Sequence, residues 1–219
     1  MNLDARARAT LGASSAMIYR ALADALDARG VRGGTCVDVG CGRGDLRRYL
    51  GARFDRYVGL DAVRYDDLPA DVDFHLADLD GADWAATNFA GDVVVAVETI
   101  EHLENPWAFV RALVRLARPG AWIAVTTPNQ LSALSLLTLV TKQRFSAFQD
   151  AMYPVHRTAL LASDLQRALG AAGVESVAIA FTRHGRLPLS AAHYPAAVAR
   201  TFPRLCSDNV LAIGRRPHG

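Results

Sequence analysis

Four acidic residues close or follow short apolar segments of the kind that form buried strands. Because the carboxyl ends of parallel strands meet at one edge of a sheet, we expect these side chains to surround a common crevice. A carboxylate can accept hydrogen bonds from both hydroxyls of a ribose, or from an adenine amino group. Each residue alone is equally compatible with a helix cap or a solvated loop, but the ordered set predicts a nucleoside site. The four are Asp38 in VDVGCGRGD, Asp61 in YVGLD, Asp78 in HLADL and Glu98 after DVVVAV.

A glycine-rich turn separates the first of these strands from the helix expected after it. Gly40, Gly42 and Gly44 occupy alternate positions. Such a turn lets a ligand approach the backbone and the unpaired N–H groups of a helix N-terminus, although a merely tight turn is the alternative. Two ligand classes compete for it: dinucleotides, whose loops read G-x-G-x-x-G, and S-adenosylmethionine.

The spacing and the flanking charges favour S-adenosylmethionine. The turn reads G-x-G-x-G, and Asp45 directly after it would repel a pyrophosphate. Acidic neighbours suit a ligand that carries a sulfonium and an ammonium group and no phosphate. Its one carboxylate could use the loop amides. A nicotinamide-dependent oxidoreductase is the alternative function at this point, and a non-catalytic S-adenosylmethionine-binding regulatory protein is another.

These segments, together with VETIEHLENP and LARPGAWIAVTTPN, resemble the motifs of class I S-adenosylmethionine-dependent methyltransferases. The resemblance is to the group that includes ubiquinone-biosynthesis-type O-methyltransferases; it spans roughly residues 35 to 130 and continues in HRTALLASDLQRALGAAGV. It implies an α/β fold with a three-layer Rossmann-like sheet of about seven strands. That sheet is mostly parallel with the last strand antiparallel, and helical cap insertions accompany it.

The resemblance also implies which residues bind the cofactor. Contacts are expected from Asp38 and Gly40, and Asp61 is expected to bind the ribose. Asp78 is expected to accept from the adenine amino group, with the Leu79 backbone against the ring edge. No metal ligand is expected. The full expected set is Asp38, Gly40, Cys41, Gly42, Asp61, Ala62, Asp78, Leu79 and Glu98.

Two histidines are candidates for a general base, which methyl transfer requires only if the acceptor is a protonated hydroxyl or amine. His102 follows the fourth strand in ETIEHLENP, and an imidazole of ordinary pKa near 6.5 suits proton removal at neutral pH. His156, in MYPVHRTA, is the second candidate. The alternative is architectural: Glu101 and His102 hold the loop by hydrogen bonds, since this pair recurs in the resembled group whatever the substrate.

Strands and helices must alternate to place these residues together, and the apolar pattern predicts that they do. The last two strands have no helical pattern between them, which indicates an antiparallel edge pair. The expected strands are 35–39, 57–60, 72–76, 92–97, 122–126, 174–181 and 209–213. The expected helices lie around residues 18–26, 45–52, 106–117 and 161–169, the third closed by Arg118-Pro119-Gly120.

Two long connections interrupt this pattern within a single domain, residues 1–219, that opens with a helical segment over residues 1–33. Residues 130–157 and 182–208 are expected to be substrate-cap insertions. LSALSLLTLV in the first predicts a helix that closes over the crevice, and so a small hydrophobic or aromatic methyl acceptor; a helix that plugs its own core is the alternative. The same segment permits a weak peripheral membrane contact. In the second, scattered arginines could meet an anionic part of the acceptor but more often are solvated.

Composition and motifs argue against nucleic acids and membranes as stable binding partners. The 219 residues carry a formal net charge of +2, and ETIE stands where nucleic-acid amino methyltransferases carry an Asn/Asp-Pro-Pro-aromatic tetrad, so no stable nucleic-acid binding is expected. No segment has the roughly 18 uncharged apolar residues that span a bilayer. The first residues have no apolar segment typical of a secretory signal, and three cysteines show no zinc-like spacing. We therefore expect a cytoplasmic protein; the oligomeric state is not predicted.

Overall fold

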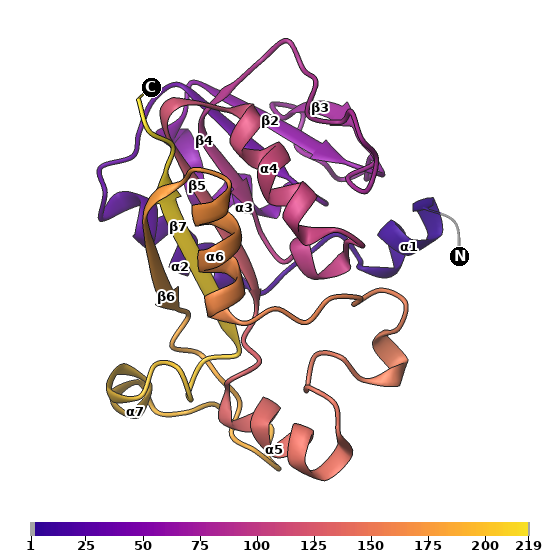
Figure 1. The fold of residues 1–219 in the computed structure, drawn as a ribbon, viewed down its shortest axis with the longest axis vertical. Coiled ribbons are helices and arrows are strands. Elements are labelled where there is room, and N and C mark those ends of the chain that lie inside the picture. The colour runs from indigo at the N-terminus through magenta and orange to yellow at the C-terminus, as the bar shows by residue number, and fades with distance from the viewer. Residues whose placement is uncertain (1–2, 219) are drawn as a thin grey trace.

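A seven-stranded sheet forms the centre of the computed structural model, which describes residues 3–218 (Figure 1). The strand order is β3-β2-β1-β4-β5-β7-β6. Neighbouring strands from β3 to β5 pair in parallel, whereas β7 is antiparallel to both β5 and β6. The expected mostly parallel sheet with an antiparallel last strand is confirmed. The strands are β1 Thr35–Val39, β2 Arg56–Asp61, β3 Asp73–Leu76, β4 Gly91–Ala96, β5 Ala117–Pro128, β6 Glu175–Phe181 and β7 Asn209–Arg215.

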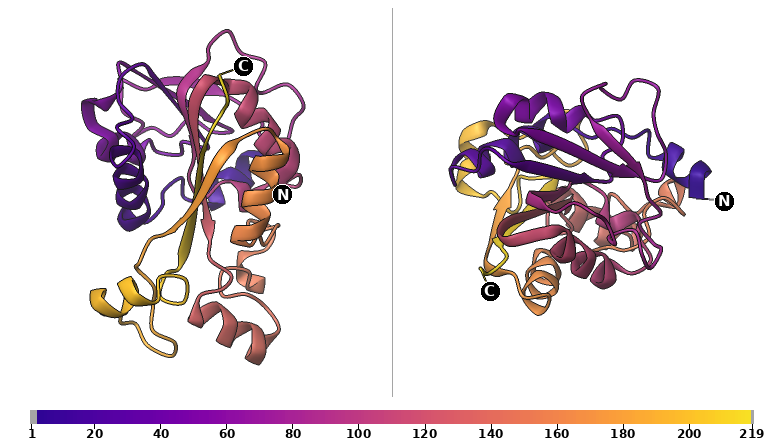
Figure 2. Two further views of the ribbon diagram at one scale, coloured as in Figure 1. Left: turned by 60° about the vertical axis from the view of Figure 1, so that its left-hand side comes forward. Right: turned by 90° about the horizontal axis from the view of Figure 1, so that it is seen from above.

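Helices cover both faces of this sheet, so that the protein has three layers (Figure 2). One apolar cluster joins α4 and α6 to one face, and a second joins α2 and α3 to the other. The α-helices are α1 Leu3–Ala9, α2 Ala16–Asp27, α3 Asp45–Leu50, α4 Pro106–Leu116, α5 Ala133–Lys142, α6 Ala162–Ala171 and α7 Ala196–Thr201. Three short 3₁₀ segments are η1 Gly51–Arg53, η2 Ile100–His102 and η3 Asp150–Met152.

The central strands of the sheet are covered on both faces. All five residues of β1 are buried, and β4 is buried along almost its whole length. Strands covered on both faces need continuous apolar sequence, which DVVVA supplies. The helix after β4 begins as expected: the Asn105 side chain accepts a hydrogen bond from the Ala108 amide (2.9 Å), and Pro106 occupies the first turn.

Two expectations about the elements were wrong. The short helix α7 lies between β6 and β7, where none was expected, because six residues are too few to show a helical period. Strand β5 begins at Ala117 and so includes the segment expected to end α4. Gly120 there has a φ of 79°, and its amide donates to Arg216 O (3.0 Å). The chain directly after β7 therefore pairs with a segment whose sequence predicts a turn.

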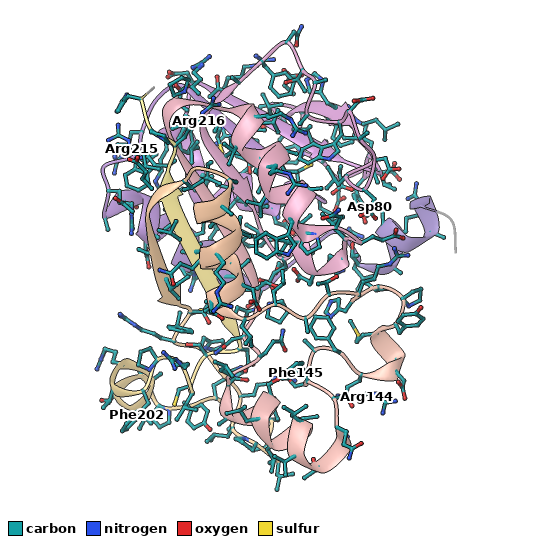
Figure 3. All side chains as sticks on the ribbon, viewed as in Figure 1. Asp80, Arg144, Phe145, Phe202, Arg215 and Arg216 are labelled. Atoms are coloured by element: carbon teal, nitrogen blue, oxygen red, sulfur yellow. The ribbon has the colours of Figure 1, made fainter. Side chains whose placement is uncertain are left out.

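The two insertions meet beyond the carboxyl ends of β5 and β6, the strands on either side of β7, at the lower end of Figure 1. The Asn129 side chain donates to Arg204 O (2.7 Å), and the Ala133 amide donates to Leu205 O (2.9 Å). Figure 3 places Phe145 of the first insertion and Phe202 of the second in this region.

Helix α5 neither closes over the crevice, as expected of a cap, nor plugs the core of the sheet, which was the alternative: none of its residues lines the pockets at the glycine turn. Its one fully buried residue is Ser135, and Val140 is 81% exposed. In the part of the chain that the structure describes, no helix combines the length and the apolar composition needed to cross a membrane.

Candidate functional site

The glycine turn after β1 is packed so closely that side chains have no room. Gly40 and Gly42 have φ values of 77° and 53°. A Cβ atom on Gly40 would collide with the Thr99 side chain, and one on Gly42 would collide with the carbonyl oxygen of Gly12. Glycine is therefore required at both positions for the backbone conformation and for the close approach.

The amides of this turn already have partners within the chain. The Gly40 and Cys41 amides donate to Leu60 O at 2.7 and 3.1 Å. The Gly42 amide donates to Asp61 Oδ2 at 2.8 Å, and the Arg43 amide donates to Gly12 O at 2.8 Å. The expected contact between a ligand carboxylate and these amides is therefore not available in this arrangement.

Two adjoining pockets at the turn share Gly40 and Asp61 in their walls. Eight of the nine expected cofactor residues line one or both of them. The first pocket is lined by Ala7, Thr10, Gly40, Asp61, Ala62, Leu79, Thr99, His102 and Leu103. The second is lined by Gly12, Ala13, Ser14, Tyr19, Asp38, Gly40, Cys41, Gly42, Leu46, Asp61, Val97 and Glu98.

Asp78 is the expected residue that lines neither pocket. Its side chain is exposed, and Oδ1 accepts a hydrogen bond from the Asp80 amide (3.1 Å), which is the geometry of a local turn. Its neighbour Leu79 lines the first pocket. Of these two expected residues, Leu79 therefore lines a pocket and Asp78 does not.

Asp38 and Asp61 carry carboxylates whose surroundings disfavour charge. Asp38 is 2% exposed, and among residues 3–218 its carboxylate has one side-chain partner, the Tyr57 hydroxyl, which donates to it (2.7 Å). Burial raises the pKa of Asp38 to about 7. Burial also raises the pKa of Asp61, against the effect of hydrogen bonds from backbone amides, among them that of Gly42. A carboxylate has about four acceptor positions, so Asp61 keeps capacity for further donors.

Glu98 is held at the end of β4 from two directions. Thr126 Oγ1 donates to Oε1 (2.8 Å), and Asn209 Nδ2 donates to Oε2 (2.7 Å). Its φ of 49° lies in the left-handed region. Burial raises the pKa of Glu98, and the charge of Glu101 raises it further. The second pocket therefore brings together three carboxylates, none of which has an arginine or lysine partner among the ion pairs of residues 3–218.

Tyr19 is a site residue that the sequence analysis missed. It lies on α2 with 7% of its surface exposed, and its oxygen accepts a hydrogen bond from the Ser14 amide (2.8 Å). Because that bond uses a lone pair, the hydroxyl proton can be donated into the second pocket. The signal for it in the sequence was a tyrosine next to Ile18 on the apolar face of the helix, since a buried tyrosine hydroxyl usually has a polar partner.

The segment before α2 was missed as well. Residues from Ala7 to Ser14 contribute to the walls of both pockets. Arg43 and Tyr65 hold this segment in place. Arg43 Nε donates to Leu11 O (2.8 Å), and its guanidinium stacks over the Tyr65 ring. The Tyr65 hydroxyl in turn donates to Ala7 O (3.1 Å). No periodic pattern marks such a segment, so its place over the turn comes from tertiary contacts.

The two candidate bases lie next to each other. The rings of His102 and His156 have centroids 4.9 Å apart, and His102 lines the first pocket whereas His156 does not. His102 Nδ1 bonds Val155 O (2.9 Å), and His156 Nδ1 bonds Ala147 O. A carbonyl oxygen only accepts, so in each neutral ring the proton lies on Nδ1 and the lone pair on Nε2.

The Glu101 carboxylate lies close to this pair. It is 1% exposed, Thr127 Oγ1 donates to its Oε2 (3.2 Å), and burial raises its pKa to about 8. Burial lowers the pKa of His156, and the neighbouring His102 lowers it further. The Arg157 and Thr158 amides donate to Glu101 O at 2.9 and 3.0 Å. The expected architectural contacts of this loop are therefore present beside the two imidazoles.

Comparison with known proteins places this arrangement among methyltransferases. A family model described as "Methyltransferase domain" matches residues 15–179. The ubiquinone biosynthesis O-methyltransferase of Idiomarina loihiensis is 27% identical over 160 residues, which cover 68% of this chain and 65% of that protein. The enzyme of the same name from Pseudomonas paraeruginosa is 31% identical over 110 residues, 46% of this chain and 47% of that protein. The chain thus spans about half to two thirds of the length of these relatives.

Solved structures share the fold at low sequence identity. A SAM-dependent methyltransferase from Archaeoglobus fulgidus has a TM-score of 0.59 at 16% identity, over 90% of this chain and 94% of that one. The N-methyltransferase NodS from Bradyrhizobium japonicum, solved with S-adenosyl-L-homocysteine, has a TM-score of 0.57 at 14% identity, over 90% of this chain and 85% of that one. These likenesses concern the fold.

Proposed function

This chain belongs to the methyltransferase domain family, and we propose that it transfers a methyl group from S-adenosylmethionine to an oxygen or nitrogen atom of a small acceptor. The observation that carries the proposal is the second pocket, whose described wall residues include three carboxylates and no lysine, arginine or histidine. A pyrophosphate would be repelled there, whereas a sulfonium and an ammonium group would be attracted. The nicotinamide-dependent alternative is therefore not favoured.

The residues present fit S-adenosylmethionine. Burial without a cationic partner keeps the pKa of Asp38, Asp61 and Glu98 above the ordinary range, and a bound cation would relieve that cost. We assign the methionine end of the cofactor to the second pocket. The nucleoside end is assigned to the first pocket, where Asp61 has acceptor positions for the ribose and Leu79 offers an apolar wall.

Tyr19 can supply the hydrogen-bond donor for the cofactor carboxylate that the glycine turn does not supply. The ligand's carboxylate needs donors, and the turn amides are occupied. We assign this role to the Tyr19 hydroxyl, supported by Ser14 in the same wall. A neutral donor suits a pocket in which a lysine or arginine would instead pair with the acids.

Methyl transfer from a sulfonium requires mainly that the protein position the acceptor atom. The bound cofactor supplies a methyl group on a sulfonium, which is already a good leaving group. The protein then has to hold an acceptor atom about 3–3.5 Å from that methyl and in line with the bond that breaks. His102 borders the first pocket and His156 packs against it, so these two side chains are assigned the proton that an acceptor hydroxyl or amine gives up.

The acceptor is proposed to be small and hydrophobic or aromatic, with oxygen the favoured atom. The relatives' names support oxygen, since the curated proteins are called O-methyltransferases. Of the first insertion, it is the segment around His156 that reaches the site, while the residues of α5 line neither pocket. We assign the acceptor entrance to this segment, because it borders the histidines without closing over the glycine turn.

Calorimetric titration tests the cofactor assignment directly. S-adenosylhomocysteine is expected to bind with one site per chain, and NADH is expected not to bind. Incubation with a methyl-labelled donor and panels of phenolic, carboxylate and amine acceptors then identifies the acceptor class. Tight NADH binding without a response to S-adenosylhomocysteine would overturn the proposal.

A further inference from the structure

A cavity of about 520 Å³ lies apart from the glycine turn, where the first turn of α6 and the end of β6 face the two insertions (Figure 1). None of the residues described in its walls also lines either pocket at the glycine turn. Pockets that bind small molecules usually have volumes of about 300–1,000 Å³. We propose that this cavity binds a small amphipathic carboxylate, which is a molecule with an apolar body and one carboxylate group.

Apolar side chains from three separate segments line the cavity. Ile179 and Phe181 are two positions apart on β6, so both side chains point to the same face of the sheet. They pack against the apolar cluster that joins α6 to the sheet. Leu161, just before α6, and Leu131, in the first insertion, also line the cavity. All four side chains are only partly buried, so an apolar ligand would remove further apolar surface from water.

Polar side chains from α6 and the second insertion line the same cavity. Ser163, Gln166 and Arg204 are exposed, which places polar groups where the cavity meets solvent. Arg204 is the one charged group among the wall residues that the structure describes. None of the ion pairs of residues 3–218 includes Arg204. Its guanidinium can therefore bind a carboxylate through two parallel N–H donors.

The backbone that carries Arg204 is held by a buried side chain. Asn129 is 5% exposed, and its Nδ2 atom donates to Arg204 O (2.7 Å) and to Ser207 O (2.8 Å). The Oδ1 atom of Asn129 accepts from the Leu131 amide (3.1 Å). Asn129 thus positions the backbone of Arg204, and ligand binding has to order only the arginine side chain. A backbone that is already ordered lowers the entropic cost of binding.

The charge and the donors of the walls favour a carboxylate as the head group. One arginine neutralises one negative charge, so a monoanion fits better than a doubly charged phosphate. The Ser163 hydroxyl and the Gln166 amide group supply further hydrogen-bond donors. Asp164 follows Ser163 in the chain but does not line the cavity, and its carboxylate accepts a hydrogen bond from the Leu161 amide (3.0 Å).

The pocket assigned to the methionine end of the cofactor would not accept the same ligand. Its walls contain Asp38, Asp61 and Glu98, which in their charged forms repel a carboxylate. The cavity shares no described wall residue with that pocket, so both sites can be occupied at the same time. The inference therefore goes beyond the proposed function and does not depend on it.

Calorimetric titration of the full chain with octanoate tests the site, since octanoate combines an apolar chain with one carboxylate. We expect one saturable site per chain, with the same affinity in the presence of saturating S-adenosylhomocysteine. Octanol has the same chain without the charge and is expected to bind at least about fivefold more weakly. Octyl phosphate is expected to bind no more tightly than octanoate.

Two arginine variants test the head-group contact. Arg204→Gln keeps the backbone carbonyl that Asn129 binds, and it is expected to weaken octanoate binding at least about fivefold while octanol binding stays unchanged. Arg200→Gln is the matched control, because Arg200 is an exposed arginine of α7 in the same insertion and does not line the cavity. This control variant should bind octanoate as the parent does.

A third variant tests the cavity itself. Ser163→Trp places a bulky side chain in the wall, so it should weaken the binding of both octanoate and octanol. Cooperative thermal unfolding near the midpoint of the parent shows that this variant is folded.

Four results would each overturn the inference. They are no saturable octanoate binding by the parent, equal octanoate affinity in Arg204→Gln and Arg200→Gln, octanol or octyl phosphate binding more tightly than octanoate, and competition between octanoate and S-adenosylhomocysteine. The last result would place octanoate in the cofactor pockets. If octanoate binds as expected and S-adenosylhomocysteine does not bind, the proposed function alone is contradicted.

Discussion

His102 and His156 come from opposite ends of the segment between β4 and α6, and their rings lie against each other with 4.9 Å between centroids. Backbone carbonyls orient both rings through Nδ1. The same contacts that hold the loop therefore keep the two imidazole rings side by side. The architectural and chemical readings of the Glu-His pair are not exclusive, because hydrogen bonds at one ring nitrogen leave the chemistry at the other.

Replacing His102 by alanine separates these readings. We expect His102→Ala to retain S-adenosylhomocysteine affinity within about threefold and to slow turnover by roughly 10²–10⁴-fold. Calorimetry and a labelled-methyl assay measure the two quantities, with His193→Ala as the control. A parallel fall in the free energy of unfolding and in turnover would instead assign His102 to holding the loop.

Asp61 should matter more to the cofactor than Asp78 does. Asp61→Ala removes the acceptor for the Gly42 amide and for the ribose, and hydrogen bonds to charged groups contribute about 1.5–3 kcal/mol each. We expect at least a tenfold loss of S-adenosylhomocysteine affinity. Asp78→Ala should cost clearly less, because Asp78 lines neither pocket. Equal losses in the two variants would show that the adenine contact expected from the motif is made after all.

Tyr19→Phe tests the assigned carboxylate donor. The variant should lose roughly tenfold in S-adenosylhomocysteine affinity, which corresponds to one hydrogen bond to a charged group. It should bind 5′-methylthioadenosine, which has no carboxylate, as tightly as the parent does. Tyr49→Phe is the control, since the Tyr49 ring lies 5.2 Å from that of Tyr19 and lines neither pocket. Equal loss for both ligands would mean that Tyr19 shapes the pocket and does not bind the carboxylate.

Asp38 makes stability depend on pH in a direction opposite to that of most carboxylates. Burial raises its pKa from 3.8 to about 7, so the folded chain binds its proton more tightly than the unfolded chain does. Its contribution to stability is therefore complete below about pH 4 and is lost as the pH rises to about 7, at about 1.4 kcal/mol per pKa unit. Asp38→Asn should be more stable than the parent at pH 8, with a smaller difference at pH 5. Denaturant titrations at the two pH values measure this, and an identical difference at both would contradict it.

Cofactor binding should show the complementary pH dependence. The ammonium group assigned to the second pocket favours the charged form of Asp38, so S-adenosylhomocysteine affinity should rise as the pH increases through 7 and then level off. Binding near pH 6 should release protons, seen as calorimetric heats that vary with the ionisation enthalpy of the buffer. In Asp38→Asn the rise should be much smaller. Affinity that is independent of pH between 6 and 8 in the parent would place the ammonium elsewhere.

Much of the fold could be predicted because its signals are local. The apolar run before the glycine turn predicted β1 to the residue, and Asn105-Pro106 marked the start of α4. The β5 start was misplaced because a proline and a glycine in a strand read as a turn, although pairing with the end of β7 holds that segment extended. Helix α7 was not predicted because six residues are too few to show the periodic apolar pattern of a helix.

The sequence by itself determined which residues follow each strand: an acidic residue at each of four successive strand ends and a glycine turn after the first strand. These features predicted a methyltransferase-like cofactor site. Those features depend on a few adjacent residues, whose pattern is readable in the chain. Only the tertiary structure decided that the turn amides are occupied, that Tyr19 and the segment from Ala7 to Ser14 form the walls, and that Glu101, His102 and His156 meet. Such contacts depend on the paths of long loops, which packing against the rest of the protein sets and no local propensity encodes.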